Sequence, residues 1–241
     1  MPSALSYLFF LCLLLYTQFI FSARARKRAM QAETPIAYVV PRWNSYLSII
    51  LISAFQAGIA LLIGLLNGVQ IFGSRRFELE TVLLSIAFLV LNIAFVDPAE
   101  WKYASTKVKN GIIAFLPHNG KERLIWGPVS LATAVSEEIV YRAVFFGLFY
   151  RLTGDYWAAG IFSAILFAVS HRGYGLSAVG STFFVGLVLQ WFVLISGGLY
   201  ISIAVHFLHN FFALVYALRE KQEIPATSQL EKTSEAAPGL E

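Results

Sequence analysis

The chain has very little cysteine and little charge, and each shortage excludes a class of protein. Cys12 is the only cysteine among 241 residues, which excludes a disulfide framework and a cysteine-based metal site. Charged residues make up 13% of the sequence, whereas soluble domains carry roughly a quarter. Hydrophobic residues make up 58%, and the mean hydropathy is +0.67. This composition predicts a polytopic, integral membrane protein.

The net charge of +4 comes from basic residues that cluster in short segments between apolar runs. Such a distribution orients a protein in a bilayer by the positive-inside rule, and it predicts no nucleic-acid partner. Four basic residues at positions 24–28 follow the first apolar run, which is the reverse of the order in a secretory signal. We therefore expect the first run to be a membrane span whose C-terminal end faces the cytoplasm.

Apolar runs of membrane-spanning length predict an all-α fold, a polytopic transmembrane helix bundle with about seven spans. The predicted spans are residues 4–22, 46–72, 81–96, 127–150, 156–170, 176–195 and 198–218. We divide the chain into N-terminal spans with cytoplasmic connectors (1–125), a membrane core (126–218) and a tail (219–241). The tail is rich in Glu, Ser, Thr, Ala and Pro and has no apolar period, so we expect it to be disordered.

Three charged residues interrupt the predicted fourth span near its middle: Glu137, Glu138 and Arg142. A charge at that depth costs a few kcal/mol even on lenient scales and usually faces a partner or a water-filled cavity. Glu138 and Arg142 are four residues apart, so they share a helix face and can form an ion pair. Glu137 lies about 100° further round the helix, which leaves its carboxylate for another task.

The later spans contain further polar residues. His171 ends the fifth span, and His206 and Asn210 share a face of the seventh, whereas His209 points elsewhere. In an apolar cavity, Glu137 can act as general base on a water that a histidine holds. A second histidine and an asparagine can donate hydrogen bonds to a developing oxyanion, each worth roughly 3 kcal/mol. The pattern therefore indicates hydrolysis by an activated water.

Two other kinds of hydrolytic site find less support in the sequence. No Gly-x-Ser-x-Gly motif surrounds Ser136 or Ser170, so a serine nucleophile is not indicated. No His-Glu-x-x-His motif is present, but Glu137, His171 and His206 could still hold a zinc ion with one open position. We expect no cofactor and keep zinc as the alternative.

Three motifs follow one another on successive apolar helices: Glu137-Glu138-x-x-x-Arg142, Phe167-x-x-x-His171 and His206-x-x-x-Asn210. In this order and spacing they resemble the CPBP family, also called ABI, of CAAX proteases and bacteriocin-processing enzymes. The best understood members are type II CAAX prenyl endopeptidases, which are glutamate-dependent intramembrane proteases. The resemblance covers roughly residues 126–218, and the first three spans match only in being membrane spans.

The resemblance implies a metal-independent catalytic set of Glu137, His171, His206 and Asn210, supported by Glu138, Arg142 and Phe167. In this assignment Glu137 is the general base and His171 helps to activate the same water. His206 and Asn210 would form the oxyanion site. Arg142 would pair with Glu138, and Phe167 would pack beside the site.

The same resemblance predicts a glutamic-type intramembrane endopeptidase that acts on a membrane protein or peptide. Prenyl endopeptidases tend to carry a second histidine three positions after the first, where this chain has Tyr174, so a prenylated substrate is not implied. The short chain with compact, basic loops favours a multi-pass protein of a prokaryotic inner or plasma membrane. The alternatives are a non-proteolytic immunity or scaffold protein and a proton-coupled transporter that uses Glu137 and Arg142.

Overall fold

The computed structural model describes residues 7–16, 42–73, 77–117 and 119–223. Within these ranges the chain is helical, and the predicted all-α fold is confirmed. The described residues form no strand, and their only β-type contact is an isolated bridge between Gly73 and Gly198. From residue 224 on, the predicted tail lies outside the described part of the chain.

The described residues form thirteen helical segments. They are a short helix at Tyr7–Tyr16, α2 (Arg42–Leu66), α3 (Leu79–Leu91), η2 (Asn92–Val96), α4 (Asp97–Tyr103), α5 (Thr106–Phe115), α6 (Gly120–Glu137), η3 (Glu138–Phe145), α7 (Phe146–Thr153), α8 (Tyr156–Ser170), η4 (Arg172–Tyr174), α9 (Leu176–Ser196) and α10 (Tyr200–Glu223). Both η2 and η3 are π-helical segments, and η4 is a single 3₁₀ turn.

From residue 46 on, the predicted spans correspond to helical units of the fold, since η2 joins α3 to α4 and η3 joins α6 to α7. Of the first predicted span, 4–22, the structure describes only residues 7–16, and the rest lies outside the described residues. In the part of the chain that the structure describes, three units are long and apolar enough to cross a membrane by length and composition: Trp43–Leu66, Leu79–Tyr103 and Leu176–Ser196. The unit built around η3 contains the charged residues of the predicted site, which lower its hydropathy. The last helix, α10, continues past the predicted span end at residue 218.

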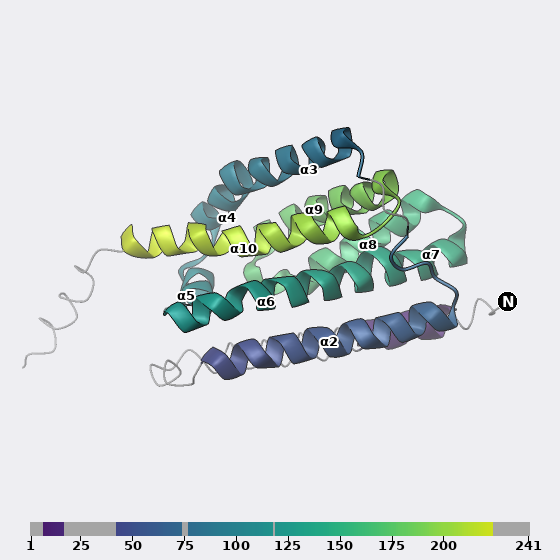
Figure 1. Cartoon of the computed structure of the whole chain (residues 1–241), viewed down its shortest axis with the longest axis horizontal. Helices are drawn as coiled ribbons and strands as arrows, with labels where there is room; N and C mark the ends of the chain where they lie inside the picture. The colour runs from purple at the N-terminus through teal and green to yellow at the C-terminus, as the bar shows by residue number, and fades with distance from the viewer. Residues whose placement is uncertain (1–6, 17–41, 74–76, 118, 224–241) are drawn as a thin grey trace, which may run out of the picture.

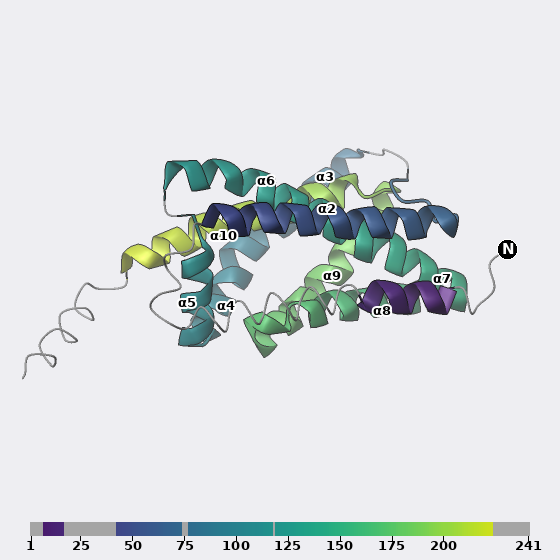
Figure 2. The same ribbon diagram turned by 90° about the horizontal axis from the view of Figure 1, so that it is seen from below.

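The helices form two layers. Figure 1 shows α2, α6, α10 and α3 side by side in that order, with α8 and α9 behind them. Turned by 90°, Figure 2 shows α8 and α9 as a separate layer beyond α2 and α6. Near the end where α6 begins, α4 and α5 run from one layer toward the other (Figure 2). This arrangement places the beginning of α6 and the ends of α8 and α10 at the same end of the bundle.

Local sequence signals explain where the site-bearing helices begin. Asn119 caps α6, because its side-chain oxygen accepts a hydrogen bond of 2.9 Å from the backbone N–H of Glu122. Gly154 ends α7 in the left-handed conformation at φ 72°, and Asp155 then caps α8 by accepting from two backbone N–H groups. The tight turn at Gly154 and Asp155 brings α8 back against η3.

The main core lies where η3 and α7 pack against α2. Its residues include Ile63 on α2 with Val144, Phe145 and Leu148 on the η3–α7 unit, and all four are at most 2% exposed. Packing at this level secures η3 from its apolar side through van der Waals contacts, since lipid tails are as apolar as these side chains. The charged side chains of η3 are thereby held in one orientation.

Two glycines allow a matched test of close backbone approach. A Cβ on Gly73 would lie 2.0 Å from the carbonyl oxygen of Gly197, whereas a Cβ on Gly154 would have nothing within 4 Å. Both glycines have positive φ, so alanine at either position costs roughly 1–2 kcal/mol in backbone strain. We expect Gly73→Ala to lower stability by a further 1–3 kcal/mol or so through overpacking. Unfolding in detergent measures the difference, and equal losses for both variants would contradict the close approach.

Candidate active site

The charged motif lies where the winding of the helix changes. Glu137 is the last residue of α6, and Glu138 is the first of η3, the π-helical segment that continues to Phe145. Segments of this kind occur often at functional sites. The sequence analysis assumed a regular α-helix here, because η3 contains no proline or glycine to mark an irregularity. The π-helical segment is a feature of the site that the sequence analysis missed.

Glu138 is the most enclosed residue of the motif, with a side chain that is 0% exposed. Its Oε1 lies 3.4 Å from Nη1 of Arg142, which is the predicted ion pair. The same Oε1 lies 2.7 Å from Nδ1 of His206, and the hydroxyl of Ser202 donates to Oε2. The sequence analysis missed Ser202, although its position four residues before His206 places both on one face of α10.

His206 lies between the two adjacent glutamates. A carboxylate only accepts hydrogen bonds, so the contact with Glu138 places a proton on Nδ1 of His206. The other nitrogen, Nε2, lies 3.5 Å from Oε2 of Glu137, which is longer than a charge-assisted hydrogen bond. The two glutamates were expected to point about 100° apart, but their side chains converge on opposite nitrogens of one ring.

Glu137 is the accessible member of the pair. Its side chain is 25% exposed, against 0% for Glu138. Oε2 of Glu137 is buried and has no hydrogen-bond partner among the described residues. Glu138, in contrast, accepts hydrogen bonds on both oxygens. The geometry therefore separates a carboxylate that is engaged by the protein from one that can receive a proton.

His171 stands directly after α8, and backbone contacts fix its ring. Nδ1 lies 2.9 Å from the carbonyl oxygen of Phe167 and 3.1 Å from the hydroxyl oxygen of Ser170. Because a carbonyl oxygen only accepts, Nδ1 carries the proton and Nε2 of the neutral ring is left as an acceptor. Within the described ranges, no hydrogen bond or ion pair joins His171 to Glu137. Nε2 of His171 can therefore accept a hydrogen bond, and no described side chain occupies it.

Phe167 is the common neighbour of the motif residues. Its ring centre lies 4.7 Å from that of His171 and 5.8 Å from that of His206. The guanidinium of Arg142 lies 4.0 Å from the same ring centre, within the range of a cation–π contact. Contacts with Phe167 thus bring residues of three predicted motifs into one cluster.

Asn210 lies near the middle of α10, and Tyr174 is the last residue of η4. Asn210 is half-buried one turn beyond His206 on α10, and its side chain makes no hydrogen bond to another described residue. Its predicted oxyanion role stays a prediction. Tyr174, in the turn between α8 and α9, has its ring centre 6.1 Å from that of His171. The position where related prenyl endopeptidases tend to carry a second histidine thus lies beside the first one.

The described part of the chain contains no group of three or more His, Cys, Asp or Glu side chains placed to hold a metal ion. Glu137, His171 and His206, the set considered for zinc, are therefore not arranged as a ligand set. Whether the reaction depends on a metal is a question for the chelator experiment described below.

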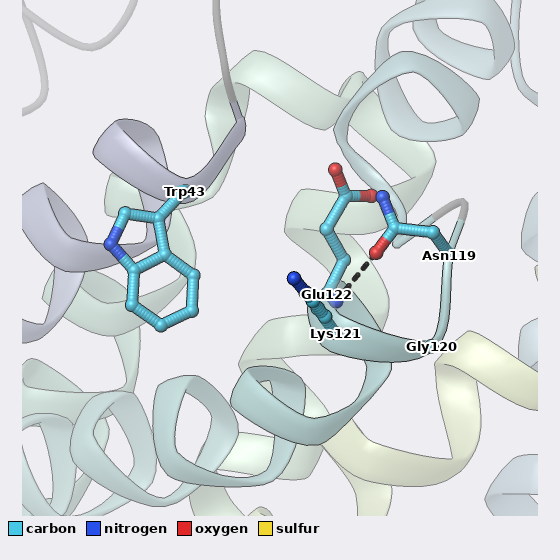
Figure 3. A pocket seen from close by; sticks show the side chains of 5 residues that line it. All are labelled: Trp43, Asn119, Gly120, Lys121 and Glu122. Atoms are coloured by element: carbon cyan, nitrogen blue, oxygen red, sulfur yellow. Dashed lines mark hydrogen bonds between the residues drawn. The ribbon is translucent and has the colours of Figure 1, made fainter.

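A hollow at the surface lies away from this cluster. It has a volume of about 630 Å³ and is lined by Trp43, Asn119, Gly120, Lys121 and Glu122. Figure 3 shows Trp43 on one side and the first turn of α6 on the other. Glu122 precedes Glu137 by 15 residues on the same helix, which is about 22 Å along its axis. The hollow is thus separate from the motif residues.

Comparison with known proteins identifies the region that contains the cluster. Residues 119–212 match the family model described as type II CAAX prenyl endopeptidase Rce1-like. Searches of curated proteins and of solved structures found no match. The matched region includes every residue of the predicted site, and the resemblance inferred from the three motifs is confirmed there. The matching family is one of proteases, which supports a hydrolase that acts on peptide bonds at a membrane.

Proposed function

We propose, from this match of residues 119–212 to a family of CAAX-type proteases, that the chain is a glutamic-type intramembrane endopeptidase. It would hydrolyse a peptide bond of a membrane-associated protein or peptide with a water that Glu137 activates. The observation that carries the proposal is the position of His206 between an accessible Glu137 and a fully buried Glu138. We place the chain in a prokaryotic inner or plasma membrane, on the strength of its compact, basic loops.

In the proposed reaction, Glu137 takes a proton from water as the water oxygen attacks the carbonyl carbon of the scissile bond. The carbonyl π electrons move to oxygen and form a tetrahedral oxyanion. Its collapse breaks the C–N bond, and Glu137 returns the proton to the leaving amine. The acyl half thus gains the hydroxyl of water and the amine half gains its hydrogen. General acid–base catalysis of this kind contributes roughly 10²–10⁴-fold.

His171 would hold the attacking water. With Nδ1 donating to the Phe167 carbonyl, Nε2 can accept a hydrogen bond from water. The backbone contact fixes the ring before substrate arrives, so the water is oriented without a cost at the moment of reaction. Zinc is not needed for this step.

His206 and Asn210 would stabilise the oxyanion from one face of α10. For His206 to donate from Nε2, the ring must carry a proton on both nitrogens. In that form the cluster of Glu137, Glu138, Arg142 and His206 has two negative and two positive charges. A balanced cluster lowers the cost of keeping these groups in an apolar bundle.

The direct test compares purified wild type, Glu137→Ala and His171→Ala on a library of membrane-derived peptides, with and without a chelator. We expect cleavage by the wild type, a loss of about 10²-fold or more in both variants, and no effect of the chelator. Cleavage that persists in Glu137→Ala would refute the assignment of the base, and loss with chelator would favour zinc.

Two outcomes of this experiment would favour the alternative functions. If no form cleaves any peptide, a non-proteolytic immunity or scaffold role gains support. A proton flux into vesicles that Glu137→Ala and Arg142→Ala both abolish would indicate a transporter.

A further inference from the structure

A second carboxylate–histidine contact lies next to the candidate active site. Nε2 of His209 is 3.0 Å from Oδ1 of Asp97, with side chains that are 28% and 14% exposed. Asp97 is the first residue of α4 and precedes the family match at residues 119–212. The first half of the chain therefore contacts the helix that carries His206 and Asn210.

The position of His209 in the sequence allows this contact to influence the orientation of the site residues on α10. It lies three residues after His206 and immediately before Asn210 on α10. Each residue of an α-helix advances 1.5 Å and turns 100°, so fixing one side chain fixes the rotation and depth of its neighbours. His206 is already held by Glu138, but Asn210 has no hydrogen-bond partner of its own among the described residues. The contact with Asp97 is thus the nearest polar constraint on the orientation of Asn210.

The π-helical segment before Asp97 influences how this residue is oriented with respect to α10. The π-helical segment η2 ends directly before Asp97, and η2 packs against α10. A π-helical turn contains an additional residue, so it rotates all residues that follow relative to a regular α-helix. The rotation therefore contributes to the direction in which Asp97 leaves the helix, and Asp97 contacts His209.

A second contact holds α4 one turn further along. The hydroxyl of Ser181 on α9 donates to Oε1 of Glu100, which lies three residues after Asp97 and near the same face of α4. The hydroxyl comes from α9, although the charge of Glu100 also acts on His209. Removing the Ser181 hydroxyl therefore tests the anchoring of α4 while the Asp97–His209 contact stays in place.

We infer that Asp97 is a positioning residue for the proposed peptide-bond hydrolysis, because its contact with His209 orients Asn210 toward the oxyanion of the reacting carbonyl. The inference rests on the proposed function and adds to it a residue from outside the matched family region. In this view Asp97 acts on the transition state through Asn210 and contributes little to substrate binding.

The test uses a peptide of the membrane-derived library that the wild type cleaves. It measures kcat and KM for Asp97→Ala, Asn210→Ala and the double variant, with Ser181→Ala as the matched control. We expect Asp97→Ala to lower kcat at least tenfold with KM unchanged, and to cause no additional loss when Asn210 is already alanine. Ser181→Ala should keep kcat within about twofold. Exchanging the pair, Asp97→His with His209→Asp, should recover part of the loss.

Multiplicative losses in the double variant, or an equal loss in Ser181→Ala, would show that Asp97 does not act through Asn210. Glu137→Gln in the same assay tests the proposed function separately, since it decides whether cleavage depends on the base at all. Amide hydrogen exchange gives a readout that needs no substrate. Asp97→Ala should raise exchange in residues 206–210 selectively, and unchanged exchange there would overturn the inference whatever the activity.

Discussion

Glu137→Gln is expected to abolish peptide-bond hydrolysis while the helix bundle stays folded. Glutamine has the same size but cannot take a proton from water, so kcat should fall on the order of 10²–10⁴-fold. Oε2 of Glu137 accepts no hydrogen bond from any described residue and the side chain is 25% exposed, so its charge is not a main support of the fold. Peptide cleavage and the apparent unfolding temperature in detergent measure the two effects on the same preparation.

Glu122→Gln is the matched control for this experiment. It makes the same chemical change in the first turn of α6, about 22 Å from Glu137 along the helix axis. We expect the activity of this variant to equal that of the wild type. A Glu137→Gln variant that unfolds would instead indicate that the charged cluster has a structural role only.

Much of the site could be predicted from the sequence because its residues recur at helical spacing. The four-residue intervals of Glu138 to Arg142 and of Phe167 to His171 place partners on one face, whatever the rest of the fold. The Glu138–Arg142 ion pair follows directly from that periodicity. A charge inside an apolar run also signals that a partner must lie nearby.

What the sequence could not show are contacts that depend on how separate helices pack. No spacing rule reveals that His206 lies between Glu137 and Glu138, because α7, α8 and α9 separate α6 from α10 in the chain. The π-helical segments η2 and η3 have no proline or glycine that would mark them. Since each segment rotates the residues that follow it, an α-helical projection misplaces Asp97, which directly follows η2.

The second large effect is expected from Arg142→Ala, which should destabilise the bundle. Arg142 is 2% exposed and provides a permanent positive charge 3.4 Å from Glu138, which is 0% exposed. Removing one partner of a buried ion pair typically costs roughly 3–5 kcal/mol, because the remaining charge stays buried. Hydrogen bonds from His206 and Ser202 to Glu138 persist, so we expect the lower part of this range. Denaturant unfolding in detergent measures the loss.

The double variant Glu138→Gln with Arg142→Met separates stability from catalysis. It removes both buried charges at once, and such replacements are often neutral or stabilising, so most of the stability should return. Hydrolysis should not return, because a neutral amide at position 138 can still accept from Nδ1 but lacks the negative charge that supports His206 with a proton on both nitrogens. If stability does not recover, the contact of Arg142 with the ring of Phe167, 4.0 Å away, is its main contribution. If hydrolysis recovers fully, the anchoring of His206 by Glu138 is not part of the mechanism.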